Sequence, residues 1–258
     1  MLLRIIAIRV GVLGFILGIW HFASTLGWVD ARLLPPPATV VTTLFGLVGD
    51  QTFLTHAAAT FSRVLIVFVI GVPLAVVSGF MIAEQASARE RLAPVIYFLM
   101  GAPKSIFLPV FIQLFGVGTL QKVVFGVSYM YFALAAVTIA GVRSVSPQLV
   151  LAARSFGASR TGVYRTVYLR AILPTLVNGM RMALIFSIMG VLAAEMFASR
   201  SGLGQLIMVW GEEYRSAQML AVVLLISAVT IGLNEAIALV ERGLSPSREI
   251  SAIQGASA

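Results

Sequence analysis

The sequence contains no cysteine, few charged residues and only two histidines. Without cysteine, disulfides, thiolate metal sites and cysteine nucleophiles are excluded. Charged residues make up 11% of the 258 residues, against about 25% in an average soluble domain. His21 and His56 have no acidic residue at metal-ligand spacing. These shortages leave little material for an enzyme that needs converging acids, bases and metal ligands, although a membrane-embedded enzyme with a serine-based site stays open as an alternative.

Apolar residues, in contrast, are abundant. They make up 59% of the sequence, and the mean hydropathy is +1.00. No single soluble core could hide that much apolar surface, and a bilayer span takes about 20 mostly apolar residues. The chain length therefore predicts an all-α, polytopic membrane protein with about six transmembrane helices.

Six apolar segments are long enough to be spans. The segment 92–116 is interrupted at Gly101-Ala102-Pro103-Lys104, which predicts two half-helices meeting at an angle. Gly71 and Pro73 predict a kink inside the second span. The stretch 30–50, which contains Pro35-Pro36-Pro37, is expected to break any helix and to lie in water or at the membrane interface. The expected spans are residues 10–28, 62–83, 92–116, 122–142, 172–197 and 217–240.

The basic residues fix the expected orientation, because cytosolic loops of membrane proteins are enriched in Lys and Arg. With both termini in the cytosol, the inner side carries Arg4, Arg9, Arg89, Arg91, Arg143, Arg154, Arg160, Arg165, Arg170, Arg242 and Arg248. The outer side then carries only Arg32, Arg63, Lys122, Arg200 and Arg215. This distribution accounts for the formal charge of +8 through membrane topology, so we expect no nucleic-acid partner.

The polar segment 144–174 between the fourth and fifth spans has local signals for two helices. Ser146 is placed to cap a helix that begins at Pro147, and Gly157 to end it in a left-handed conformation. Ser159 is placed to cap a second helix leading into the fifth span. Leu149, Ala153 and Phe156 share one face of the first helix by their spacing. This helix is expected either to dock into a groove on a partner protein or to rest on lipid headgroups.

A phosphate-binding loop for ATP is missing. Such a loop ends in Gly-Lys-Ser/Thr, whereas Lys104 follows Pro103 and Lys122 follows Gln121. If ATP drives transport, hydrolysis must therefore take place on a separate subunit. A membrane scaffold or a pore without a motor is a third class, which the organised loop disfavours.

Residues in this loop and elsewhere resemble a known family. Ala152-Ala153, Gly157 and Val167-x-Leu169 are similar to the cytosolic "EAA" loop of binding-protein-dependent ABC importer permeases. The combination is similar to the nitrate, sulfonate, taurine and bicarbonate group of these permeases. The other matching segments are Leu34-Pro35-Pro36-Pro37, Ala102-Pro103-Lys104, Leu108-Pro109, Phe115-Gly116-Val117-Gly118, Gly141-Val142-Arg143-Ser144-Val145, Gly179-Met180-Arg181, Ala194-Glu195-Met196-Phe197 and Ser201-Gly202-Leu203-Gly204.

The resemblance implies a type I ABC importer permease architecture. Residues 1–53 would form an N-terminal membrane helix and outer segment, 54–242 the permease core with its coupling loop 143–171, and 243–258 a cytosolic tail. The partners implied are ATPase subunits carrying ATP-Mg, an extracytoplasmic substrate-binding protein, a second permease copy and membrane lipid, with no cofactor on this chain. The residues implied in ATPase docking are Leu149, Leu151, Ala152, Ala153, Phe156, Gly157 and Ser159.

Two positions depart from the family motif. Leu151 stands where the motif has its glutamate, and Arg170 stands where the closing proline is usual, with Pro174 four residues later. The loss of the acidic group removes a possible salt bridge to the motor. Docking is therefore expected to depend more on packing and on the arginines.

Charged groups at membrane depth are expensive and usually face a cavity or a partner. Lys104, next to the helix break at Pro103, is a candidate for the transport pathway, and so are Arg181 and Glu195. Lys104 could instead snorkel to the cytosolic side, and Arg181 could reach the inner headgroups. Glu195 could pair with Arg200 or lie at the interface. A positive pair of Lys104 and Arg181 would suit an anionic substrate.

Overall fold

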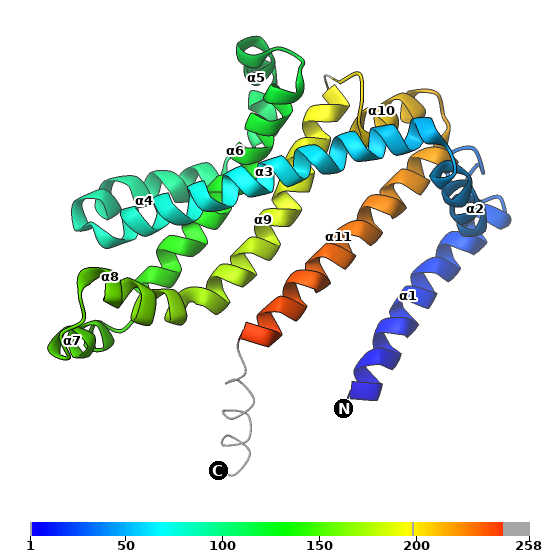
Figure 1. The fold of residues 1–258 in the computed structure, drawn as a ribbon. Helices are drawn as coiled ribbons and strands as arrows, with labels where there is room; N and C mark the ends of the chain where they lie inside the picture. The colour runs from blue at the N-terminus through cyan, green and yellow to red at the C-terminus, as the bar shows by residue number, and fades with distance from the viewer. Residues whose placement is uncertain (1, 198, 245–258) are drawn as a thin grey trace. The chain divides into compact units, whose positions relative to one another are not determined.

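The computed structural model describes residues 2–197 and 199–244, and all regular elements in these residues are helices (Figure 1). The chain divides into two units, one made of residues 1–60 with 195–228 and the other of residues 61–194 with 229–258. Three long helices pass from one unit into the other. They are α3 (Gln51–Glu84), α9 (Leu169–Phe197) and α11 (Ser216–Leu244).

The first unit contains α1 (Leu2–Thr25), α2 (Pro37–Val48) and α10 (Leu203–Glu212). The expectation that residues 30–50 break any helix is wrong, because α2 occupies most of them. Pro37 is its first residue, a position where the missing N–H costs nothing and the fixed φ suits the helix. The turn before α2 is tied to α1 by Trp20, whose Nε1 donates to the Pro35 carbonyl at 2.9 Å.

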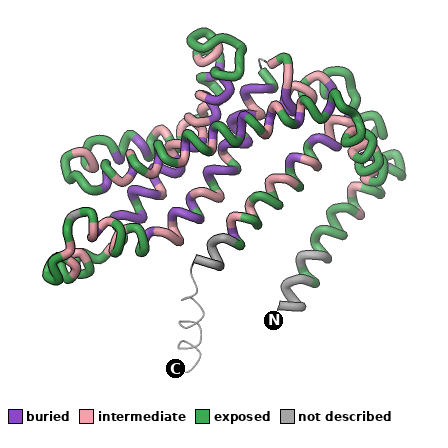
Figure 2. Tube along the Cα trace, in the orientation of Figure 1, coloured by how far each residue is buried: buried purple, intermediate pink, exposed green. Residues whose placement is uncertain are grey.

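The second unit is centred on α6 (Thr119–Arg143), which has the largest share of buried residues among the spans (Figure 2). Both α4 (Ala86–Gly101) and α5 (Leu108–Phe115) pack on α6. Close approach between α6 and α9 depends on a pair of glycines, since a Cβ on Gly190 would lie 2.9 Å from the Cα of Gly126. The unit also contains η1 (Lys104–Phe107), α7 (Pro147–Ser155), α8 (Arg160–Val163) and η2 (Tyr164–Tyr168).

Four helices in the described residues are long and apolar enough to cross a membrane: 51–84, 119–143, 161–197 and 216–239. The bent pair of α4 with η1 and α5 makes a fifth if it counts as one span. The expected break at Gly101 to Lys104 is confirmed, with a bend of 90°. The span expected over 10–28 is helical as far as Thr25. Its described apolar part, Gly11–Thr25, is shorter than the four helices that are long enough to cross a membrane.

One further expectation needs correction. The second span begins at Gln51 instead of residue 62, because polar residues such as Thr52 and Thr55 are accommodated in its first turns. Arg63 and Lys122 are both buried within the chain, and their expected place on the outer side of the membrane stays a prediction. Lys122 is held inside because its Nζ donates to the carbonyls of Val117 and Gly118, at 2.7 and 3.2 Å. Of the proposed tail 243–258, residues 245–258 lie outside the described residues.

Candidate functional site

The segment after α6 forms a short helix with well-defined ends. Ser146 caps α7, and its Oγ accepts a hydrogen bond from the Gln148 N–H at 3.3 Å. Gly157 follows the helix with φ +79°, the left-handed conformation predicted from the sequence. The N–H of Gly157 donates to the Arg154 carbonyl at 2.9 Å, and that of Ala158 to the Ala153 carbonyl at 3.0 Å. This pair of bonds is a Schellman motif, so the last carbonyls of α7 are satisfied and the bend is fixed.

The second helix of the loop is also capped as predicted. The Oγ of Ser159 accepts from the Gly162 N–H at 3.1 Å, at the start of α8. From there α8, the π-helical segment η2 and α9 follow one another without a break. The loop is therefore built directly onto a membrane span, as the sequence indicated.

The larger leucine side chains of α7 are exposed. None of its residues is buried. Leu149 is 55% exposed, Leu151 67% and Phe156, directly after the helix, 92%. Of the other predicted docking residues, Ala152, Gly157 and Ser159 are exposed, and Ala153 is half-buried. A large aromatic side chain with this exposure is costly in water and favours a partner surface.

An aromatic cluster that sequence reasoning missed joins the loop to α3. The Phe80 ring makes edge-to-face contacts with Tyr164 and with Tyr168, each with 5.5 Å between ring centroids and planes at 78°. The Tyr164 hydroxyl donates to the Glu84 carboxylate. The spacing of the two tyrosines by four residues was a signal that they share a helix face, but nothing local pointed to Phe80 as their partner. We call Phe80, Tyr164 and Tyr168 the aromatic clamp.

Lys104 lies at the break between α4 and α5 and contacts both α4 and α6. Its Nζ donates to the Met100 carbonyl at 3.0 Å, which satisfies an acceptor near the end of α4. The same ammonium lies 5.6 Å from the centroid of the Tyr129 ring and 5.8 Å from that of Phe132, both on α6. Pro103 directly precedes η1. A role of these two residues in the pathway stays a prediction.

Arg181 lies on α9 and contacts α11. Its Nε donates to Oδ1 of Asn234 at 2.9 Å. The side chain is half-buried. Lys104 and Arg181 have different hydrogen-bond partners. The structure therefore does not join the two cations, which were predicted to act as a pair, through a shared contact.

Glu195 is completely buried, with 0% of its surface exposed. Its Oε2 accepts from the Thr60 hydroxyl at 2.8 Å and from the Gly204 N–H at 3.0 Å, so the carboxylate lies at the N-terminus of α10, where the helix dipole favours a negative charge. Thr60 Oγ1 in turn accepts from the Leu203 N–H at 2.7 Å. Arg200 is exposed and makes no ion pair in the described residues. Pairing with Arg200 is therefore not observed, and a pathway or interface role for Glu195 stays a prediction.

Glycine at position 202 allows the backbone to pass close to the Glu195 carboxylate. Its φ is +116°, and a Cβ at this position would lie 2.3 Å from the Glu195 carboxyl carbon. Nδ1 of His56 lies 3.1 Å from the Gly202 N–H and 3.2 Å from the Gly202 carbonyl oxygen, so the ring contacts both backbone groups of this glycine. Sequence reasoning found Glu195 but missed His56 and Thr60, because more than 130 residues separate them from their partners.

The chain matches the family of binding-protein-dependent transport system inner membrane components over residues 60–248. It belongs to this family. The taurine transport system permease protein TauC of Escherichia coli is 28% identical over 94% of this chain and 90% of its own length. A putative aliphatic sulfonates transport permease protein of the same organism, SsuC, is 30% identical over 75% of this chain and 73% of its own length. The family identifies the chain as a permease of an ABC importer and a multi-pass membrane protein.

Solved structures show the same fold. A chain of the inward-facing MetNI methionine ABC transporter superposes with a TM-score of 0.60 at 21% sequence identity, covering 81% of this permease and 98% of that chain. This likeness confirms the all-α, type I importer architecture predicted from the sequence.

Proposed function

We propose that this permease moves a small organic anion into the cytoplasm, as one of two copies that work with two separate ATPase subunits and an external substrate-binding protein. ATP-Mg is hydrolysed on the ATPase subunits, because this chain has no phosphate-binding loop. The names of its relatives, which are permeases for taurine and aliphatic sulfonates, support an anionic sulfonate-like solute. The arginine distribution supports cytoplasmic termini in the plasma membrane.

The observation that carries the proposal is the exposure of Phe156 at the end of a rigid, capped helix. Burial of a phenylalanine side chain contributes about 1.5–3 kcal/mol, and Leu149 and Leu151 add to the apolar surface available to a partner. Leu149 and Leu151 are two residues apart, so the exposed apolar groups are not confined to one face as on a headgroup-bound amphipathic helix. This exposure favours docking of α7 into a groove on the ATPase over a position on the lipid headgroups.

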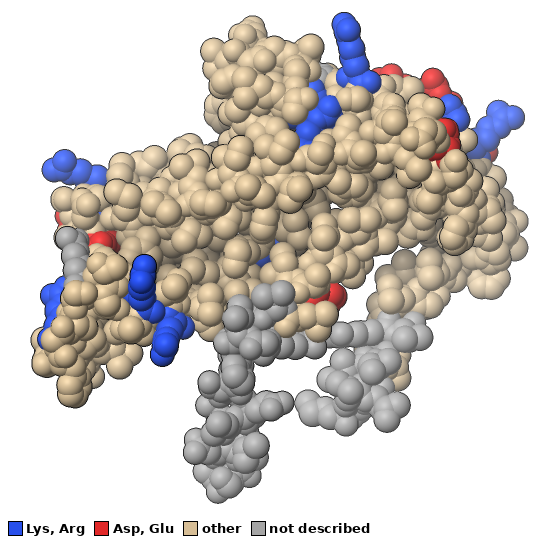
Figure 3. Space-filling view, in the orientation of Figure 1, with Lys and Arg blue, Asp and Glu red and all other residues tan. Residues whose placement is uncertain are grey.

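Positive charge around the loop is consistent with a cytosolic position. In the space-filling view, several Lys and Arg side chains lie around α4, α7 and α8, others lie near α10, and the sides of the long helices carry few (Figure 3). Residues of this kind favour the cytosolic side of a membrane.

Motion of the docked loop would reach the membrane spans along two routes. One is the continuous path from α8 through η2 into α9. The other is the aromatic clamp, which ties the loop end of α9 to Phe80 on α3. Closure of the ATPases would thereby move α3 and α9 together and reorient the spans between inward-open and outward-open states.

Reconstitution tests the function as a whole. The permease, its ATPase and its binding protein are placed in liposomes with ATP on the side of the ATPase, and uptake of a radiolabelled alkanesulfonate is measured. Uptake is expected only when all three proteins and ATP are present. Uptake without ATP would indicate a motor-independent pore, and ATP hydrolysis by the isolated permease would contradict the assignment of hydrolysis to another subunit.

The aromatic clamp gives a test of how the loop is coupled to transport. Phe80→Leu removes both ring contacts, each worth about 0.5–1.5 kcal/mol, while it keeps an apolar side chain in place. We expect the number of solutes transported per ATP to fall about tenfold, with ATPase association unchanged. Phe98→Leu is the matched control, because Phe98 is exposed and makes no ring contact in the described residues. An unchanged transport ratio in Phe80→Leu would exclude the clamp from the coupling route.

A further inference from the structure

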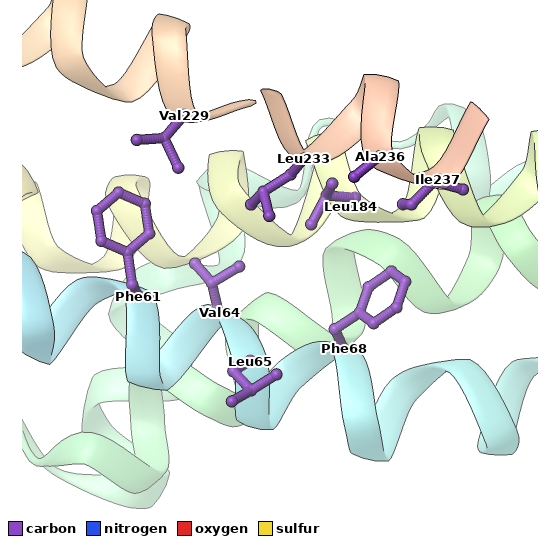
Figure 4. Close-up of a pocket in the computed structure, with 9 residues that line it drawn as sticks. All are labelled: Phe61, Val64, Leu65, Phe68, Leu184, Val229, Leu233, Ala236 and Ile237. Atoms are coloured by element: carbon purple, nitrogen blue, oxygen red, sulfur yellow. The ribbon is translucent and has the colours of Figure 1, made fainter. Parts of the chain in front are cut away.

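An apolar cleft lies between three spans of the second unit, with a volume of about 530 Å³. The side chains from α3, α9 and α11 converge on it in the close-up view (Figure 4). Every residue that lines it is apolar, and the buried Val64 and Leu184 lie among them. Its main side chains are Phe61, Val64, Phe68, Leu184, Leu233 and Ile237.

A cleft with this lining cannot hold water well, because water needs polar partners that these side chains do not provide. Its volume falls within the range of small-molecule sites, about 300–1,000 Å³. The occupant is therefore expected to present an alkyl or aromatic group to the cleft.

Arg181 is placed by its helix spacing near the apolar lining. Arg181 precedes Leu184 by three residues on α9, and Asn234 precedes Ile237 by three on α11, so each polar residue shares a helix face with a lining residue. The hydrogen bond from Arg181 Nε to Asn234 Oδ1 joins these two faces. A neutral amide is thus the guanidinium's partner, and Glu235, next to Asn234, makes no ion pair with it in the described residues.

This arrangement is suited to an anion with an apolar body. An arginine at membrane depth usually faces a partner or a pathway, and its planar guanidinium has further N–H donors suited to a sulfonate or carboxylate. The charge of Arg181 is not neutralised by a carboxylate of the described chain, so an incoming anion would supply the missing charge. The adjacent cleft would hold the rest of the molecule.

We propose that Arg181 and this cleft form a specificity site for the transported solute, in which the guanidinium holds a single anionic group and the cleft holds its alkyl or aryl body. The proposal rests on the function proposed above and narrows its substrate class. Inorganic anions and the zwitterionic taurine lack an apolar body for the cleft. Alkanesulfonates gain about fourfold in affinity for each methylene that the cleft buries, until the cleft is full.

Binding to the permease–ATPase complex tests the site without the binding protein. The complex is placed in nanodiscs of zwitterionic lipid, and a fluorescent pyrenesulfonate probe is displaced by sulfonates from methanesulfonate to octanesulfonate, with empty nanodiscs as the baseline for partition into lipid. Affinity is expected to rise with chain length in the wild type, and taurine is expected not to compete.

Two matched variants test whether the alkyl chain binds in the cleft and not elsewhere along the same helix. Ala236→Phe fills the cleft and should lower octanesulfonate affinity at least tenfold, whereas Ala228→Phe, at an exposed alanine on the same helix outside the cleft, should leave it unchanged. Arg181→Gln should weaken all sulfonates alike, and Arg181→Lys should restore part of the affinity because it restores the charge.

Three results would overturn the proposal. The first is equal octanesulfonate affinity in Ala236→Phe and Ala228→Phe. The second is loss of a bound phospholipid in Ala236→Phe, detected by native mass spectrometry, together with a failure of alkanesulfonates to displace the probe. The cleft would then be a lipid-binding site. The third is dissociation of the two permease copies in Ala236→Phe alone, which would make the cleft a subunit interface. The reconstituted uptake assay measures import independently of sulfonate binding to the cleft. It therefore distinguishes a failure of the proposed binding site from a failure of the proposed importer function.

Discussion

Replacing Phe156 with aspartate is expected to separate the permease from its ATPase. The side chain is 92% exposed, so the substitution removes no contact that the permease itself needs for folding. In the docked complex the ring would be a buried aromatic anchor, and loss of such an anchor costs about 2 kcal/mol or more, roughly a thirtyfold weaker association. The carboxylate adds a desolvation penalty in a packed interface. Association measured in detergent and ATP-driven uptake in liposomes should fall together.

Matched substitutions at the same bend show whether association with the ATPase depends on the apolar side chain of Phe156 or on the backbone conformation at Gly157. Phe156→Leu keeps an apolar side chain and should retain most of the association. Gly157→Val should weaken it, because a β-branched residue does not adopt φ +79° without strain, although a Cβ at this position would meet no other atom. Gly157→Asn should be tolerated, since asparagine enters the left-handed region more readily. If Phe156→Asp left association intact and only reduced contact with lipid vesicles, α7 would be a headgroup-bound helix.

The docking loop was predictable because its signals are local. Ser146, Gly157 and Ser159 each satisfy or redirect backbone groups within a few residues, so the sequence specifies the caps directly. Proline was less informative, since it breaks a helix in the interior but begins one at Pro37. The break at Pro103 was recognised because a glycine and a lysine accompany it inside a long apolar run.

Contacts between distant parts of the chain were not predictable in the same way. The sequence marks Glu195 and Lys104 as unusual because charge is rare in a span, but it does not say what each contacts. Glu195 lies at the start of α10, and Lys104 lies against the Tyr129 and Phe132 rings of α6. Both partners follow from helix packing in three dimensions, which hydrophobic periodicity does not encode. The cleft beside Arg181 was missed for the same reason.

Gly202→Ala is expected to destabilise the permease more than any other single methyl group added at a glycine of a turn. Two independent costs act at this position. The backbone has φ +116°, which side chains with a Cβ rarely adopt, and this strain costs about 1–3 kcal/mol. The new Cβ would also lie 2.3 Å from the buried Glu195 carboxyl carbon, and relief of such overpacking costs about 1–3 kcal/mol more.

Gly116→Ala provides the control that isolates the second cost. Gly116 has φ +72°, so it carries backbone strain, but a Cβ there would meet no atom within 4 Å. The difference in melting temperature between the two variants therefore measures the clash with Glu195. The carboxylate has little room to move away, because its Oε2 is held by both Thr60 and the Gly204 N–H. A shift in Gly202 would also disturb its hydrogen bond to His56. Thermal unfolding of the detergent-solubilised permease should show the larger loss for Gly202→Ala, and equal losses would mean that Glu195 does not hold α10 as tightly as its hydrogen bonds indicate.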